Sequence, residues 1–152
     1  MARVLNSWLS QPRHVFANYF FSALIFLISN GASAQELTTT AVLGQEHVGI
    51  SLQARDADCL KIKQINIGAV FCFAMTMKTP NEAWLKDLKV QRFDMIMPEH
   101  RHGMVTRASV RSSKTGEYLI DGVKAHMPGE WKITIDLVQG KSAAHVAIPL
   151  KL

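Results

Sequence analysis

The chain has 152 residues, of which 48% are hydrophobic, and a formal net charge of +5 from 17 basic and 12 acidic residues. Two of the basic residues, Arg3 and Arg13, lie in an N-terminal leader, so 15 basic and 12 acidic residues remain beyond it, a net charge of +3. These basic residues are scattered rather than clustered, which argues against nucleic-acid binding and favours an ordinary solvated surface.

The N-terminus has the features of a secretory signal peptide. A basic, acid-free start is followed by an apolar run over residues 15–28 and then by Ala32-Ser33-Ala34, the small-residue spacing of a cleavage site before Gln35. We therefore expect residues 1–34 to be a signal peptide and the mature protein to be periplasmic. The alternative is a retained N-terminal membrane anchor, although the apolar run is shorter than the roughly 20 residues that a span needs.

Residues 35–152 are long enough for one domain but not for two. The mature part contains two cysteines, Cys59 and Cys72. In an exported protein an even pair favours a disulfide, which would stabilise the fold by roughly 3 kcal/mol in the chain-entropy model. Two buried thiols and a thiolate metal site are the alternatives.

The mature domain is predicted to be all-β. Residues 68–79 place Phe71, Phe73, Met75 and Met77 on one face of a strand, and both faces are apolar enough for burial. Residues 130–138 place Trp131, Ile133, Ile135 and Leu137 on one side and polar residues on the other, as in a half-buried strand. Further strands are expected at residues 46–53, 60–67, 88–97, 104–111, 117–125 and 143–150, with a helical turn at 81–89.

Turn residues separate these strands regularly. Pro128-Gly129 fits a type II turn, because proline fixes the first central residue and glycine accepts the positive φ of the second. About seven strands with regular turns predict a β-sandwich of the immunoglobulin-like kind. Tyr118, entering a strand after Gly116, resembles the tyrosine corner of such sandwiches, although a tyrosine there is equally explained as a core residue.

Two segments rich in histidine and methionine could carry chemistry. The first runs from Met95 to Met104 and contains Pro98, His100, His102 and Gly103; the second is His126-Met127-Pro128-Gly129. Imidazole and thioether groups together suit copper better than calcium or magnesium. If the backbone is extended at His100-Arg101-His102, the two imidazoles point to the same side.

The two segments are predicted to meet. Two strands separate them, and if each strand crosses the sandwich once, the chain returns to the end from which it started. The alternative explanations are structural: Met95 and Met97 fit core positions, and histidines in such a loop can simply hold a turn. The lone histidines His47 and His145 fit ordinary strand positions.

No catalytic constellation is apparent. The sequence has no G-x-S-x-G elbow, no H-E-x-x-H and no glycine-rich phosphate loop, and its acidic residues are spread singly. We therefore expect a protein that is not an enzyme.

From Gly68 to Leu137 the chain resembles the YtkA-like family of small exported bacterial domains, which is related to the FixH-like proteins. The resemblance consists of residues 97–104, Gly116-Glu117-Tyr118 and His126-Met127-Pro128-Gly129-Glu130-Trp131, in that order and spacing. It implies an immunoglobulin-like β-sandwich in the envelope, and association with copper handling and respiratory-oxidase assembly. The cysteine pair and the strand at 143–150 depart from the family pattern.

Two functions follow as hypotheses. The first is a periplasmic copper-binding or copper-delivery module that holds Cu(I) and passes it to an envelope partner in oxidase or metalloprotein assembly; its ligands would be His100, His102 and Met104, then His126 and Met127. The second is a non-metal accessory domain that docks on an envelope protein through the same loops. Contact with a membrane would come only from an uncleaved leader.

Overall fold

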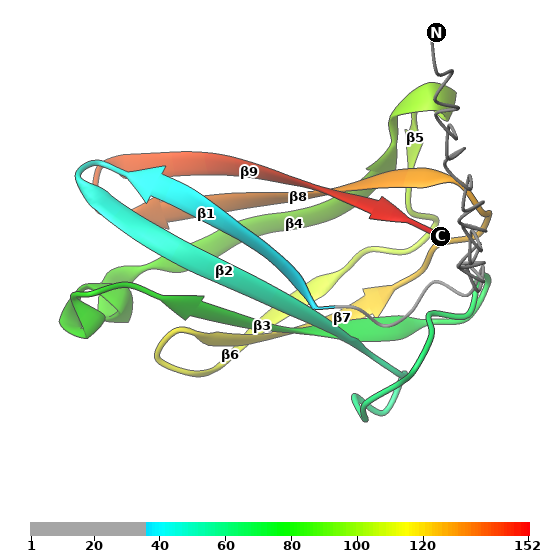
Figure 1. The fold of residues 1–152 in the computed structure, drawn as a ribbon, viewed down its shortest axis with the longest axis horizontal. Helices are drawn as coiled ribbons and strands as arrows, with labels where there is room; N and C mark the ends of the chain where they lie inside the picture. Colours follow the sequence, from blue (N-terminus) through cyan, green and yellow to red (C-terminus); the bar gives the residue numbers. More distant parts are fainter. Residues whose placement is uncertain (1–35) are drawn as a thin grey trace, which may run out of the picture.

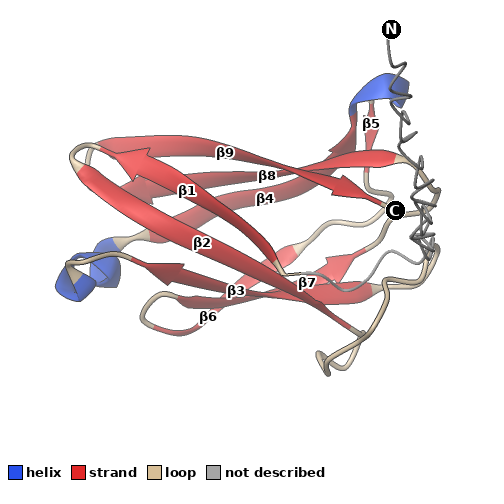
Figure 2. Cartoon of the chain, in the orientation of Figure 1, coloured by secondary structure: helices blue, strands red, loops and turns tan. Residues whose placement is uncertain are grey.

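The computed structural model describes residues 36–152, and the predicted signal peptide lies outside these described residues. The chain folds into two antiparallel β-sheets that lie one over the other, with almost no helix (Figures 1 and 2). The predicted all-β class is confirmed. Among the described residues, no helix is both long enough and apolar enough to cross a membrane.

The first sheet has five strands, in the order β1-β2-β3-β7-β6. Their bounds are β1 Leu37–Leu43, β2 Glu46–Arg55, β3 Phe71–Lys78, β7 Glu117–Val123 and β6 Ser109–Lys114. The turns β1–β2 and β6–β7 each contain a glycine with positive φ, Gly44 at 63° and Gly116 at 73°. A residue with a Cβ would be strained at either position.

The second sheet has four strands, in the order β5-β4-β8-β9. Their bounds are β5 His102–Gly103, β4 Lys89–Met97, β8 Glu130–Gln139 and β9 Ser142–Lys151. β5 covers only the last residues of β4, pairing Gly103 with Ile96 and His102 with Met97. Most of the outer edge of β4 therefore has no strand beside it in the described chain.

The core fills the space between the sheets with the faces that the alternation predicted. Phe73, Met75 and Met77 of β3 are at most 2% exposed, and Trp131, Ile133, Ile135 and Leu137 of β8 are equally buried. Met95 and Met97 of β4 are also core residues, at 0% and 2% exposed. The methionines that precede the histidine loop thus pack in the interior, as expected from their positions.

The strand predictions were wrong in three places. Residues 60–67 form a loop with isolated bridge residues, among them Lys61 paired with Arg55, instead of a strand. Residues 104–108 are also irregular, so the strand predicted at 104–111 begins only at Ser109. The sequence analysis missed β1, whose threonine-rich stretch pairs along its full length with β2. The helical turn is confirmed as a 3-10 helix, η1, at Glu82–Asp87.

Tyr118 links the two sheets. It lies on β7 of the first sheet, and its hydroxyl donates a 2.7 Å hydrogen bond to the carbonyl oxygen of Leu88, the residue before β4 of the second sheet. The acceptor is 30 residues upstream, so the bond differs from the local bond of a tyrosine corner. Burial raises the pKa of the Tyr118 phenol.

Candidate functional site

Three loops gather at one end of the two-sheet structure, on the right in Figure 1. They are the β2–β3 loop (residues 56–70), the segment between β4 and β6 (residues 98–108) and the β7–β8 loop (residues 124–129). The first and third are joined by a 2.8 Å hydrogen bond from the amide of Gly68 to the carbonyl of Ala125. The predicted return of the chain to one end is confirmed.

Three histidines form a cluster at this end. The ring centroids of His102 and His126 are 4.9 Å apart, and those of His100 and His102 are 5.7 Å apart. We call His100, His102 and His126 the histidine cluster. Trp131 packs against the cluster. Its ring centroid lies 5.6 Å from that of His126 and 6.2 Å from that of His102, and both ring pairs are T-shaped.

The backbone brings His100 and His102 together in an unexpected way. Pro98–His100 form a 3-10 turn, η2, with Pro98 at its start, and Arg101 then adopts a left-handed conformation with φ 54°. The backbone at His100-Arg101-His102 is therefore not extended, so the condition under which extended geometry would point both imidazoles to one side is not met. The reversal at Arg101 still leaves the two rings close, inclined by 31°.

The ring nitrogens differ in their partners. Nδ1 of His102 lies 3.3 Å from the carbonyl oxygen of Gly103, which can only accept, so a hydrogen bond there puts the proton on Nδ1 and leaves the Nε2 lone pair free. Nδ1 of His126 is buried without a hydrogen-bond partner. The nitrogens of the three rings do not all lie within 4.8 Å of one another. The cluster is thus close-packed but not gathered around a single point.

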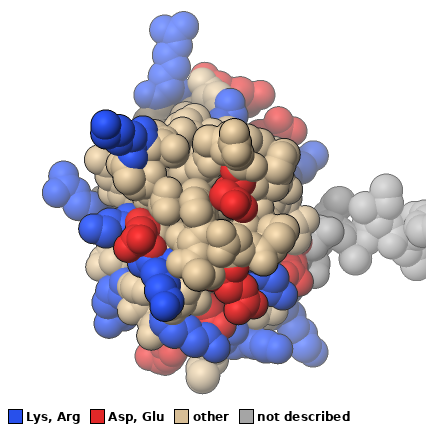
Figure 3. Space-filling view, turned by 90° about the vertical axis from the view of Figure 1, so that its left-hand side faces the viewer, with Lys and Arg blue, Asp and Glu red and all other residues tan. Residues whose placement is uncertain are grey.

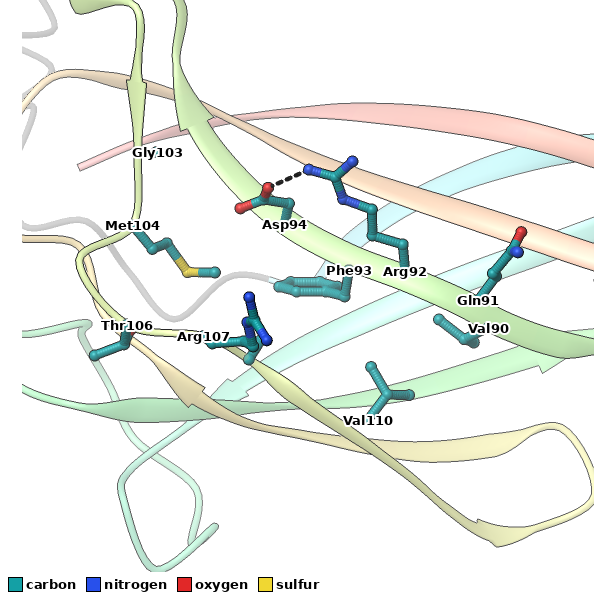
Figure 4. Close-up of a pocket in the computed structure, with 11 residues that line it drawn as sticks. Val90, Gln91, Arg92, Phe93, Asp94, Gly103, Met104, Thr106, Arg107 and Val110 are labelled. Atoms are coloured by element: carbon teal, nitrogen blue, oxygen red, sulfur yellow. Dashed lines mark hydrogen bonds and ion pairs between the residues drawn. The ribbon is translucent and has the colours of Figure 1, made fainter.

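The methionines are placed less favourably. Met127 is half-buried, and its carbonyl oxygen accepts a 3.1 Å hydrogen bond from Nε1 of Trp131. Met104 points into a groove whose lining includes none of the histidines (Figure 4). Among the candidate ligands, the structure brings the three imidazoles together and directs Met104 elsewhere.

That groove has a volume of about 640 Å³. It runs between β4 and β6, which belong to different sheets and do not pair with each other. Its floor includes Val90, Phe93 and Val110, and Arg107 extends into it (Figure 4). Arg92 at its rim forms a 2.8 Å ion pair with Asp94, which raises the pKa of Arg92 through the hydrogen bond and the opposite charge. The groove thus combines apolar residues with two arginines, of which Arg92 is paired with Asp94.

The turn residues of the two loops have identifiable roles. Gly129 has φ 132°, and a Cβ there would overlap Cε of Met97 in the core. Residues 127–129 form a bend where a type II turn was expected, and the amide of Gly129 donates a 2.8 Å hydrogen bond to the carbonyl oxygen of Leu152. A Cβ on Gly103 would lie 3.3 Å from the Met95 carbonyl oxygen, so glycine lets β5 approach β4 closely.

Cys59 and Cys72 form a disulfide, as predicted, with their Cα atoms 5.8 Å apart. Oδ1 of Asp121 lies 3.3 Å from Sγ of Cys59. The two sulfurs and this carboxylate oxygen all lie within 4.8 Å of one another. Among the described residues, no other three ligand atoms from His, Cys, Asp or Glu side chains lie this close together. Sequence reasoning missed Asp121, because it is 62 residues from Cys59 and belongs to no local motif.

The two other histidines in the described part of the chain lie outside the cluster. His47 is exposed on β2, and Nδ1 of His145 on β9 lies 2.6 Å from Oδ1 of Asp136 on the neighbouring strand β8. At the opposite end of the molecule, basic side chains lie mainly around the margin with acidic ones among them (Figure 3). That view shows no extended patch of one sign.

No protein-family model matches this chain, and no curated protein or solved structure is significantly similar to it.

Proposed function

We propose that this protein is an exported metal-binding module, with copper as its cargo and the histidine cluster as its site. The observation that carries the proposal is the contact of His102 with His126, at 4.9 Å between ring centroids, across 24 residues of sequence. Two imidazoles from different loops, with a third 5.7 Å away, supply a nitrogen-rich donor set. Imidazole is a good ligand for copper.

The donor atoms fit such a cation. The contact of His102 Nδ1 with a backbone carbonyl is the usual outer contact of a ligating histidine, since it fixes the tautomer and turns Nε2 outward. His126 leaves Nδ1 unpartnered, so its ring is not committed to a hydrogen bond with the protein at that atom. Met127, next to His126 in sequence, is the nearest thioether by chain position.

The finer assignment is part of the same proposal. A YtkA-like or FixH-like identity, an immunoglobulin-like sandwich and a periplasmic location would place the cluster where copper is handled during oxidase or metalloprotein assembly. The disulfide supports an oxidising compartment. We propose a binding and delivery role without catalysis.

The proposal is tested by Cu(I) affinity, measured by competition with a chromophoric chelator while the disulfide is kept oxidised. Wild-type protein is expected to bind one equivalent. The variants His102→Ala and His126→Ala should each lose at least about tenfold in affinity, and His100→Ala somewhat less. His145→Ala and His47→Ala are matched controls outside the cluster. Unchanged affinity in the double variant His102→Ala/His126→Ala would refute the proposal.

A second function is supported by the groove beside Met104. Apolar residues beside the charged side chains of Arg92, Asp94 and Arg107 fit a protein partner, as in the docking hypothesis. Under this alternative, Arg107→Glu would abolish partner binding, whereas the histidine substitutions would leave it intact.

A further inference from the structure

The carboxylate of Asp121 lies against the disulfide, although the disulfide offers it no hydrogen bond. Oδ1 of Asp121 is 3.3 Å from Sγ of Cys59, but a disulfide sulfur carries no hydrogen to donate. In the reduced protein, the Cys59 thiol could donate to this oxygen, or both sulfurs and the carboxylate could ligate one cation. The contact therefore has an obvious chemical role only after reduction.

We propose that the reduced protein holds a thiophilic metal ion of the Zn²⁺ type between Cys59, Cys72 and Asp121. This site shares no residue with the histidine cluster and does not depend on the proposed copper function. Thiolate sulfur and carboxylate oxygen both ligate Zn²⁺, which is usually four-coordinate, so the fourth position would be left to water or a partner's ligand. Their atoms already lie within 4.8 Å of one another.

An irregularity in the sheet brings Cys72 and Asp121 together. Phe71 pairs with Val123 and Phe73 with Ile120, so the single residue Cys72 on β3 faces two residues on β7, Asp121 and Gly122. Gly122 accommodates the extra residue with φ 72°. Such a bulge redirects side chains, and here it sets the carboxylate beside the cysteine pair.

The β2–β3 loop supplies the second sulfur. Its first turn is held by Oδ1 of Asp56, which accepts hydrogen bonds from the amides of Asp58 and Leu60. Cys59 then adopts φ 60°, and its carbonyl accepts a 3.3 Å hydrogen bond from Nη1 of Arg55. These contacts do not involve the disulfide, so they can hold Cys59 near Cys72 after reduction.

The charges around the site suit a cation with three anionic ligands. Oδ2 of Asp121 is held by an ion pair with Nη2 of Arg111, which leaves Oδ1 directed at the sulfurs. Orientation of a ligand by an outer partner is usual at metal sites. Arg55 and Arg111 also offset the negative charge that a divalent ion would leave uncompensated.

An ion can reach the site from one side. Cys72 is 1% exposed, whereas Cys59 is partly exposed and the Asp121 side chain is 26% exposed. Reduction of the Cys59–Cys72 disulfide requires a dithiol. The dithiol supplies two electrons and two protons, which convert the two cysteines to thiols, and is itself oxidised to a disulfide. Metal binding then releases both thiol protons to solvent. The oxidation state of the pair would thus decide whether the ion binds.

The test uses Zn²⁺ and its spectroscopic substitute Co²⁺ with the full mature protein, reduced by a dithiol that is removed anaerobically before titration. Reduced wild type is expected to bind one equivalent with thiolate-to-cobalt charge-transfer absorption, a signal that requires sulfur ligands. Oxidised wild type should give none. Asp121→Asn should weaken Zn²⁺ binding by about tenfold or more, whereas the matched variant Asp136→Asn should not.

Two results would overturn the proposal: no charge-transfer band in the reduced protein, or equal Zn²⁺ affinity in wild type and Asp121→Asn. If reduction unfolds the chain, Zn²⁺ should raise the melting temperature of reduced wild type and not that of Asp121→Asn, because only the folded state holds the third ligand. Absence of that difference also refutes it. The variant His102→Ala/His126→Ala should keep the band, so this result and the copper result can fail separately.

Discussion

The hydroxyl of Tyr118 donates a 2.7 Å hydrogen bond to the carbonyl oxygen of Leu88 and so joins the first sheet to the second. Both residues are buried, at 9% and 2% exposed, and water does not readily replace either partner. Tyr118→Phe leaves the Leu88 carbonyl unsatisfied and should lower the free energy of unfolding by about 1–3 kcal/mol. Urea denaturation at neutral pH measures this loss, and a change near zero would contradict it.

The same tyrosine predicts a loss of stability in alkali. Because the pKa of Tyr118 is raised on folding, its contribution is fully present below the unfolded-state value of about 10 and is lost as pH rises through the folded-state value. The free energy of unfolding of wild type should therefore fall above about pH 10 more steeply than that of Tyr118→Phe. Denaturant midpoints measured across this range in both proteins provide the check; parallel curves would exclude the explanation.

Gly129 should not tolerate a side chain. Its φ of 132° and the overlap of a Cβ with Met97 predict that Gly129→Ala costs more than the roughly 1 kcal/mol of an ordinary left-handed position. Gly140→Ala is the matched control, since Gly140 has φ 59° and nothing within 4 Å of its Cβ position. A double-mutant cycle with Met97→Ala should recover the steric part of the loss. Additive effects would mean that the two sites do not interact.

Removal of the disulfide should destabilise the domain without changing its fold. The bond closes a loop between residues 13 apart in sequence, for which the chain-entropy model gives about 3 kcal/mol. We expect this decrease for Cys59→Ser/Cys72→Ser in urea denaturation, with an unchanged far-ultraviolet circular dichroism spectrum. Wild type measured under reducing conditions without metal should behave in the same way.

Trp131 is expected to position the histidine cluster. Trp131→Phe keeps an aromatic ring in the core but removes the hydrogen bond from Nε1 to the Met127 carbonyl. We expect a loss of about 1–3 kcal/mol in stability together with weaker Cu(I) binding, because the loop that carries His126 loses its anchor. A core substitution away from the loops, Ile135→Val, should reduce stability without changing affinity.

The sequence predicted those features that depend on neighbouring residues. Alternation over residues 130–138 identified the buried face of β8, because side-chain direction in a strand has a period of two. The alternation of lysine and isoleucine at 60–67 was misleading, since a strand also needs a partner strand, and this segment lies in the β2–β3 loop. Local pattern carries no information about whether a pairing edge is available.

The candidate sites show the same division. Counting strand crossings was sufficient to predict that His102 and His126 lie at the same end of the molecule. The position of Asp121 beside Cys59 could not be predicted, because it depends on the bulge at Cys72 and on a contact between residues 62 apart. The position of Met104 could not be predicted for a related reason: the irregular backbone after β5 places it in the lining of the groove, which includes none of the histidines.

The open side of the structure, between β4 and β6, has a consequence for solubility. β6 ends its sheet, so its free backbone groups could pair with a strand of another molecule and start aggregation. Its sequence, Ser-Val-Arg-Ser-Ser-Lys, contains one apolar residue, and Arg111 and Lys114 are each held by an acidic side chain of β7. A second chain adding to this edge would meet charged, hydrated side chains, which disfavour edge-to-edge pairing.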